Sequence, residues 1–112
     1  GGENVFVVKN GSVFTPQKSS VLRGITRDTV MHLLRDQGLD VEETHLTRDD
    51  LYVADEIFFT GTAAEVTPVR ELDNRAIGTG KPGPITHELQ KAYAALVRGQ
   101  NPKYKGWLTP VE

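Results

Sequence analysis

The chain has 112 residues, of which 38% are hydrophobic and 25% charged, and its formal net charge is −2. This composition excludes an intrinsically disordered chain and is that of a globular segment. Charges of both signs are interspersed without a basic stripe, so nucleic acid is not an expected partner. The absence of cysteine excludes disulfides and thiolate metal sites, and it favours a cytoplasmic location. The longest apolar runs are far too short to cross a bilayer, so no membrane partner is expected.

Residues 3–8 and 12–15 are rich in β-branched and aromatic side chains and flank Asn10-Gly11. Two apolar runs around Asn-Gly predict a β-hairpin with a two-residue turn. The chain begins at Gly1 without a methionine and enters this strand-like sequence almost at once. We therefore expect an internal portion of a longer protein.

Residues 24–28 are expected to open a helix that runs to about Gln37. Thr26 is a candidate N-cap, and Asp28 places negative charge in the first turn, where the helix dipole favours it. Gly38 suits the left-handed position that ends a helix.

The next elements alternate between strands and short helices. An exposed or edge strand is expected over residues 39–46, and residues 47–50 resemble a capping box that starts a short helix through Ala54. Later in the chain we predict a buried strand over 56–60, a tight connection over 61–64, a strand over 65–69 with an edge proline, a hairpin tip at 73–75, a loop over 78–84 and a helix over 85–97. Hairpin strands mixed with about three helices define an α+β (mixed α/β) fold.

Two segments combine small residues, hydroxyl groups and a reversal of the chain. In the first, residues 24–26 stand at a helix start, whose unpaired N–H groups and positive dipole end can bind a phosphate. In the second, residues 61–64 connect two strands and leave backbone N–H groups open to a carboxylate or phosphate. Helix capping and a tight turn explain the same residues without any ligand. The spacing of the three histidines matches no metal site, so no metal is expected: His32, His45 and His87.

Three clusters resemble the signature of class IV aminotransferases, which depend on pyridoxal 5′-phosphate (PLP). In order along the chain, they are Asn4-Val5-Phe6, Val13-Phe14-Thr15, and residues 22–27 with the sequence LRGITR. Residues 55–65 (DEIFFTGTAAE), 83–86 (GPIT) and 106–108 (GWL) further resemble the branched-chain amino acid aminotransferases of this family. Separated motifs in a fixed order are more specific than any single glycine-rich turn.

The resemblance implies two binding roles for the segments described above. The helix start would hold the PLP phosphate, and the turn after the buried strand would contact the phosphate and receive the substrate α-carboxylate. The implied cofactor-binding residues are Leu22, Gly24, Ile25, Thr26 and Thr62, and the implied substrate-binding residues are Gly61, Thr62 and Ala63.

The resemblance also implies that the catalytic machinery is incomplete in this chain. Residues 1–112 would be the C-terminal portion of the PLP-binding large domain of the D-amino acid aminotransferase-like fold, with the small N-terminal domain absent. In this family the lysine that forms the Schiff base lies in the preceding part of the protein, and none of the chain's own lysines stands in a family lysine motif. We therefore assign no catalytic residue, and we expect the fragment alone to be inactive.

The implied activity of the full-length parent is transfer of the amino group of leucine, isoleucine or valine to 2-oxoglutarate. The implied partners are the missing N-terminal portion, the amino acid and 2-oxo acid substrates, and further copies of the parent in a homo-oligomer. Two relatives share the first motif and remain alternatives, namely D-amino acid aminotransferase and aminodeoxychorismate lyase. A third alternative from another class is a non-catalytic, stand-alone binding module.

Overall fold

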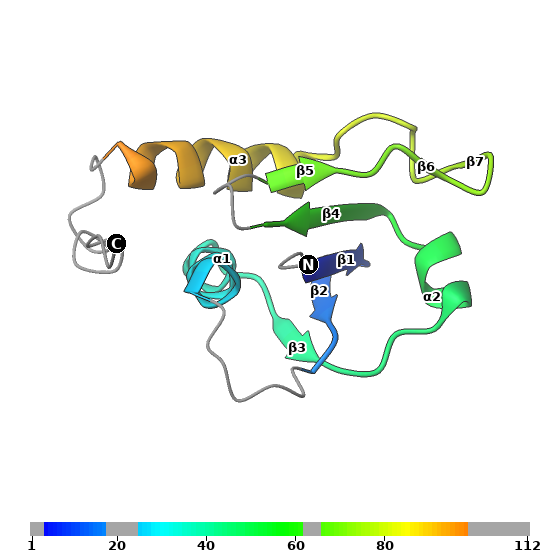
Figure 1. Cartoon of the computed structure of the whole chain (residues 1–112), viewed down its shortest axis with the longest axis horizontal. Coiled ribbons are helices and arrows are strands. Elements are labelled where there is room, and N and C mark those ends of the chain that lie inside the picture. Colours follow the sequence, from blue (N-terminus) through cyan, green and yellow to red (C-terminus); the bar gives the residue numbers. More distant parts are fainter. Residues whose placement is uncertain (1–3, 18–24, 62–65, 99–112) are drawn as a thin grey trace.

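The computed structural model describes residues 4–17, 25–61 and 66–98. Within these residues a five-stranded sheet, in the order β3-β2-β1-β4-β5, is joined by three helices and a separate two-stranded hairpin (Figure 1). The α+β fold class is therefore confirmed. The elements are β1 (Asn4–Lys9), β2 (Ser12–Thr15), α1 (Ile25–Asp36), β3 (Val41–Glu43), α2 (Arg48–Tyr52), β4 (Glu56–Thr60), β5 (Val66–Pro68), β6 (Glu71–Leu72), β7 (Arg75–Ala76) and α3 (Pro84–Val97).

The predicted hairpin at Asn10-Gly11 is confirmed. Asn10 and Gly11 have φ angles of 52° and 82°, and Lys9 pairs with Ser12 across the turn. Positive φ at both central residues matches the right-handed twist of the strands, and asparagine and glycine adopt it most readily. The turn therefore sets the register of β1 against β2.

The strands are antiparallel with one exception. β1 pairs antiparallel with both β2 and β4, and β4 with β5. β3 pairs parallel with β2, because α1 carries the chain from one end of the sheet back to the other. A parallel neighbour requires such a crossover, whereas antiparallel neighbours need only a short turn.

The side chains of the sheet alternate between two cores. Phe6 of β1 and Phe58 of β4 are fully buried on the face covered by α1 and α3, and their rings stack with centroids 5.0 Å apart. Val7 and Ile57 point to the opposite face and pack with Ile77 in a second cluster. This period of two follows from the pleat. The helix-side core is the larger one, and α1 and α3 contribute Val30, Met31, Leu33, Leu34, Leu89, Tyr93 and Leu96 to it.

A carboxylate of the sheet holds the start of α3. Glu56 is 7% exposed and accepts hydrogen bonds from the backbone N–H groups of Ile85 and Thr86, at 3.1 and 2.7 Å. The Thr86 hydroxyl donates a third bond of 2.7 Å to the same carboxylate. An acidic group at a helix N-terminus satisfies orphan N–H donors and complements the dipole. Gly83 leaves the space, because a Cβ there would lie 2.1 Å from Glu56 Cδ.

On the opposite face, the capping box predicted for α2 is confirmed. Thr47 and Asp50 exchange the two reciprocal bonds, with Asp50 N–H donating to Thr47 Oγ1 and Thr47 N–H donating to Asp50 Oδ2. Tyr52 of α2 donates its hydroxyl to Asp73 at the tip of the β6–β7 hairpin. Arg75 lies 4.8 Å above the Tyr52 ring in a cation–π contact. These contacts tie α2 to the small hairpin.

Side chains from the helices cover one outward carbonyl on each outer strand of the described sheet. Gln90 of α3 donates to the carbonyl of Val66 in β5, at 3.0 Å. Arg35 of α1 donates to the carbonyl of Val41 in β3, also at 3.0 Å. Pro68 of β5 has no N–H to offer, as expected for an edge strand. Both edges therefore present fewer free backbone groups to another strand.

Two predicted boundaries were wrong. α1 begins at Ile25, so Thr26 is the second helical residue and not the N-cap. The strand expected over residues 39–46 is limited to β3, whose three residues are the ones that pair with β2. Thr44 still donates its N–H to the carbonyl of Thr15, and after that contact the chain leaves the sheet for α2.

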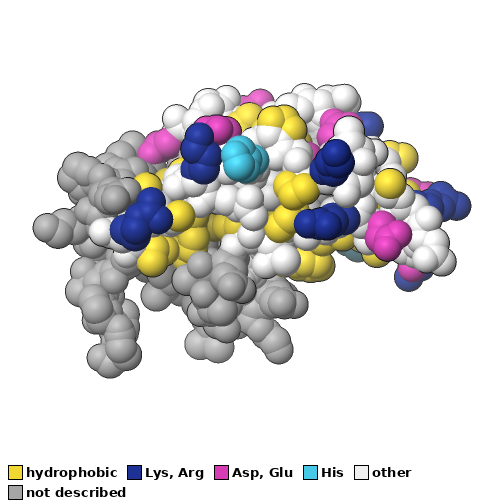
Figure 2. Space-filling model, turned by 90° about the horizontal axis from the view of Figure 1, so that it is seen from above, with side chains coloured by type: hydrophobic (Ala, Val, Ile, Leu, Met, Phe, Trp, Pro, Cys, Tyr) yellow, Lys and Arg dark blue, Asp and Glu magenta, His cyan; other side chains and the backbone are white. Residues whose placement is uncertain are grey.

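Within the described residues, no helix is long and apolar enough to cross a membrane. Seen from the side of α3, basic and acidic side chains are interspersed and apolar side chains lie between them (Figure 2). No single charge sign dominates this face, as the composition suggested.

Candidate functional site

The first turn of α1 provides the neutral donors of an anion site. Thr26 is half-buried at the second position of this 12-residue helix. The first N–H groups of a helix have no partner within it and carry the positive end of the dipole. Backbone N–H groups and a hydroxyl form a suitable donor set for a phosphate. The chemistry of this turn therefore fits the phosphate of the cofactor that the sequence implied.

The cation nearest to this turn in sequence is committed elsewhere. Arg27 is 4% exposed, and its Nη2 donates to the carbonyl of Pro16 at 2.9 Å and to Glu43 Oε2 at 2.6 Å. Its Nη1 lies 3.9 Å from Asp28 Oδ1. These contacts direct the guanidinium to the ends of β2 and β3, so it does not serve as a free cation at the helix start.

The end of β4 forms the second part of the candidate site. Thr60 is fully buried, pairs with Asn4 of β1 on one side and Val66 of β5 on the other, and precedes the half-buried Gly61. Its hydroxyl makes no hydrogen bond within the described part of the chain. A buried, unpaired hydroxyl is unusual in a folded protein. It marks this strand end as polar, next to the turn that the sequence singled out.

The strand register brings both parts to the same end of the sheet. Arg27 joins the first turn of α1 to Pro16, directly after β2. Thr15, the last residue of β2, donates its hydroxyl to the carbonyl of Val5 near the start of β1. The start of β1 pairs in turn with Thr60 at the end of β4. Neighbouring strands lie about 4.8 Å apart, so β2 and β4 are separated by about 10 Å at this end.

The structure describes three of the predicted site residues. Ile25 and Thr26 lie in the first turn of α1, and Gly61 follows β4, so these parts of the prediction meet at one end of the sheet. The remaining predicted site residues lie outside the described residues: Leu22, Gly24, Thr62 and Ala63.

The described lysines lie away from this end. Lys9 is the last residue of β1, at the opposite end of the sheet, 3.8 Å from Asp55 Oδ1. Lys91 is exposed on α3, 3.5 Å from Glu88 Oε2, and Lys81 is exposed in the loop before α3. Among the described residues, no group of three or more histidine, cysteine, aspartate or glutamate side chains could hold a metal ion.

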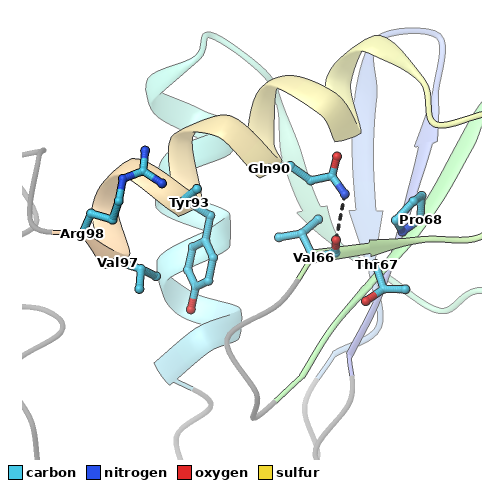
Figure 3. A pocket seen from close by; sticks show the side chains of 8 residues that line it. Val66, Thr67, Pro68, Gln90, Tyr93, Val97 and Arg98 are labelled. Carbon is cyan, nitrogen blue, oxygen red and sulfur yellow. Dashed lines mark hydrogen bonds between the residues drawn. The ribbon is translucent and has the colours of Figure 1, made fainter.

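A separate groove of about 620 Å³ runs between β5 and α3 (Figure 3). Val66 and Thr67 form one wall, and Tyr93 and Val97 form the other, with Gln90 bonded to Val66 between them. None of its described lining residues comes from α1 or from Gly61. The groove is therefore distinct from the candidate site, and its mostly apolar walls do not suit a phosphate.

Sequence reasoning missed three residues that shape the site: Arg27, Glu43 and Thr60. Arg27 stood in the signature motif as its final basic residue, and the missing information was its direction. Glu43 lies 16 positions from Arg27 in the sequence, so no local pattern could reveal their ion pair. Thr60 looked like an ordinary strand residue, because alternation alone does not show whether a hydroxyl finds a partner.

The comparisons with known proteins agree with this site. The model of the family described as "Amino-transferase class IV" matches residues 1–72, which is more than half of the chain. The chain therefore belongs to the class IV aminotransferases.

Within this family the chain is similar to branched-chain-amino-acid aminotransferases. It is 50% identical over 111 residues to the enzyme of that name from Pseudomonas aeruginosa, covering 99% of this chain and 36% of the relative. It is 54% identical over 112 residues to a protein named probable branched-chain-amino-acid aminotransferase from Aquifex aeolicus, covering 98% and 36%. The resemblance inferred from the motifs is confirmed, and the chain spans only 36% of the length of these relatives.

Solved structures of the same kind of enzyme share the fold. A branched-chain amino acid aminotransferase, from the source abbreviated T.th., has been solved in complex with N-(5′-phosphopyridoxyl)-L-glutamate. It matches with a TM-score of 0.88 and 48% identity, over 95% of this chain and 36% of that one. The enzyme from Thermobaculum terrenum in its PLP form matches with a TM-score of 0.88 and 46% identity, over 99% and 37%. Relatives of this chain have therefore been solved with PLP or a phosphopyridoxyl compound bound.

Proposed function

We propose that the chain is the C-terminal portion of the PLP-binding large domain of a branched-chain amino acid aminotransferase. In this proposal the natural protein transfers the amino group of leucine, isoleucine or valine to 2-oxoglutarate. The catalytic lysine is supplied by a part of the natural protein other than residues 1–112. PLP, when bound, supplies the electron sink for this chemistry.

The observation that carries the proposal is the meeting of two anion-binding features at one end of the sheet. The start of α1 suits a phosphate, and the turn that begins at Gly61 suits a carboxylate, about 10 Å away across two strand spacings. A phosphopyridoxyl–amino acid compound carries a phosphate at one end and an amino acid carboxylate at the other. One ligand of this type can therefore engage both features, which makes the spacing useful and not coincidental.

The residues of this chain have binding and orienting roles in the proposal. The N–H groups of Ile25 and Thr26, with the Thr26 and Thr62 hydroxyls, hold the phosphate, and Leu22 packs against the pyridine ring after the Gly24 approach. The N–H groups that follow Gly61, at Thr62 and Ala63, receive the α-carboxylate. Two fixed anion clamps orient the substrate before reaction, and such positioning lowers the barrier without any nucleophile from this chain.

The proposal is tested on the complete natural protein in two steps. Borohydride reduction followed by intact-mass measurement should show one PLP-sized addition per subunit, attached to a lysine outside residues 1–112. A transamination panel with 2-oxoglutarate should then show turnover of leucine, isoleucine and valine. Turnover of D-alanine, or lyase activity on aminodeoxychorismate, in place of these amino acids would assign the protein to a different member of the family. A purified protein with no PLP addition and no turnover refutes the proposal.

A pair of variants tests the phosphate clamp separately. Thr26→Val removes the hydroxyl and keeps the backbone N–H, and we expect PLP to bind about tenfold more weakly, as for one lost bond to a charged group. Thr26→Ser keeps the hydroxyl and is the matched control. Equal PLP affinity of wild type and Thr26→Val, in a fluorescence titration, would remove Thr26 from the clamp.

A further inference from the structure

The buried arginine in the first turn of α1 has no role in the site as derived so far. Arg27 is almost fully buried, and a buried guanidinium needs compensating partners because desolvation of a charge is expensive. It has three: the Pro16 carbonyl at 2.9 Å, Glu43 at 2.6 Å and Asp28 at 3.9 Å. Glu43 is 43% exposed and Asp28 35% exposed, so only the arginine is committed to the interior.

These contacts fix the position of the start of α1. One nitrogen, Nη2, bonds both to the residue after β2 and to the last residue of β3. Arg27 therefore ties the first turn of the helix to two adjacent strand ends. It also joins the two described ends of the segment between Gln17 and Ile25. A point attachment would leave the helix free to turn about it, whereas the rigid fork of arginine resists rotation.

The orientation of this turn matters for a phosphate. Hydrogen bonds weaken steeply as the donor angle departs from linearity. The N–H groups of Ile25 and Thr26 stand one or two residues before Arg27 on the same turn. A rotation of the helix start would misalign both groups at once, while the rest of α1 would stay packed through Val30 and Leu34.

We propose that Arg27 is a positioning residue for the PLP phosphate, acting through the orientation of the α1 N-terminus and not through its charge. This inference rests on the proposed function, because it needs a phosphate at the start of α1. Arg27 makes no contact with the cofactor in this account. Its partner Glu43 belongs to the same device, because it holds the guanidinium against β3.

The experiment compares PLP with pyridoxal, which has the same ring and aldehyde but no phosphate. Dissociation constants for both compounds are measured by fluorescence on the complete natural protein, in its apo form, as wild type, Arg27→Met and Arg27→Lys. Arg35→Met is the matched control, since Arg35 also links α1 to β3, through the Val41 carbonyl, but at the far end of the helix. The ³¹P NMR signal of bound PLP reports directly on the phosphate environment.

We expect Arg27→Met to weaken PLP binding about tenfold and to leave pyridoxal binding within about twofold, because only the phosphate bonds are misaligned. Arg27→Lys should weaken PLP nearly as much, since lysine keeps the charge and loses the fork. Both variants should shift the ³¹P signal, and Arg35→Met should change neither the affinity ratio nor the signal. A merely structural role would weaken both compounds equally.

Three results would overturn the inference. One is an unchanged ratio of PLP to pyridoxal affinity in Arg27→Met. Another is full PLP affinity in Arg27→Lys, which would assign the effect to charge. If Arg27→Met does not fold, Glu43→Gln takes its place, and an unchanged ratio there counts against the inference. A wild-type protein that does not prefer PLP over pyridoxal would instead refute the proposed function itself, so the two failures are distinguishable.

Discussion

Replacement of Glu56 should release the start of α3 while the sheet stays folded. The carboxylate accepts three hydrogen bonds, from Ile85 N–H, Thr86 N–H and the Thr86 hydroxyl. In Glu56→Gln the amide oxygen can replace Oε1 and keep both bonds to Thr86. The amide nitrogen then faces the Ile85 N–H, so that bond and the negative charge at the helix start are lost. Bonds to charged groups contribute about 1.5–3 kcal/mol each, and we expect a loss of about 1.5 kcal/mol for glutamine and about 3–4 kcal/mol for alanine.

Hydrogen exchange of the α3 peptide, read by mass spectrometry on the complete natural protein, measures this loss locally. A loss of about 1.4 kcal/mol corresponds to about tenfold faster exchange. The first turn, around Ile85 and Thr86, should accelerate about tenfold in Glu56→Gln and more in Glu56→Ala, whereas β1 and β4 should change far less.

Thr86→Val is the matched control, because it removes the hydroxyl bond and keeps both bonds from the backbone N–H groups. It should accelerate exchange less than Glu56→Ala does. Exchange in Glu56→Ala that stays within about twofold of wild type across α3 would show that packing of the helix alone holds its start, and the reasoning from the carboxylate would be wrong.

Three further predictions concern the turns and the capping box. Asn74 has φ +67° at the β6–β7 tip, so Asn74→Gly should raise the free energy of unfolding by about 0.5–1 kcal/mol, and a lower melting temperature would contradict this. Gly78→Ala should lower the free energy of unfolding by at least ~2 kcal/mol, because the residue has φ +58° and a Cβ there would lie 2.2 Å from the Asp55 carbonyl oxygen; an unchanged melt would contradict it. Bonds from the Thr47 N–H and then from its hydroxyl lower the pKa of Asp50, so the capping box is stable at neutral pH and is lost as the pH falls below about 4 through the lowered pKa. An NMR titration of the Thr47 amide should show that transition in the wild type and not in Asp50→Asn.

Local patterns were enough where the physics is local. Asn10-Gly11 defined a hairpin because the dihedral angles of two residues decide the turn. Thr47 and Asp50 defined the start of α2 because capping operates within one turn. The alternation in β4 separated Phe58 from Ile57 before any partner strand was known. The same local reasoning misplaced the start of α1 by one residue, since Thr26 is as suitable at a second helical position as at an N-cap.

The sequence by itself determined the family, the order of the elements and the identity of the two anion-binding segments, because motifs and periodicity are properties of neighbouring residues. Only the tertiary structure decided that the start of α1 and the end of β4 meet at one end of the sheet, because strand order and register depend on residues far apart in the chain. It also decided the direction of Arg27, which the motif marks only as basic. Its partners Pro16 and Glu43 are 11 and 16 positions away, and they converge on it only when α1 packs across β2 and β3.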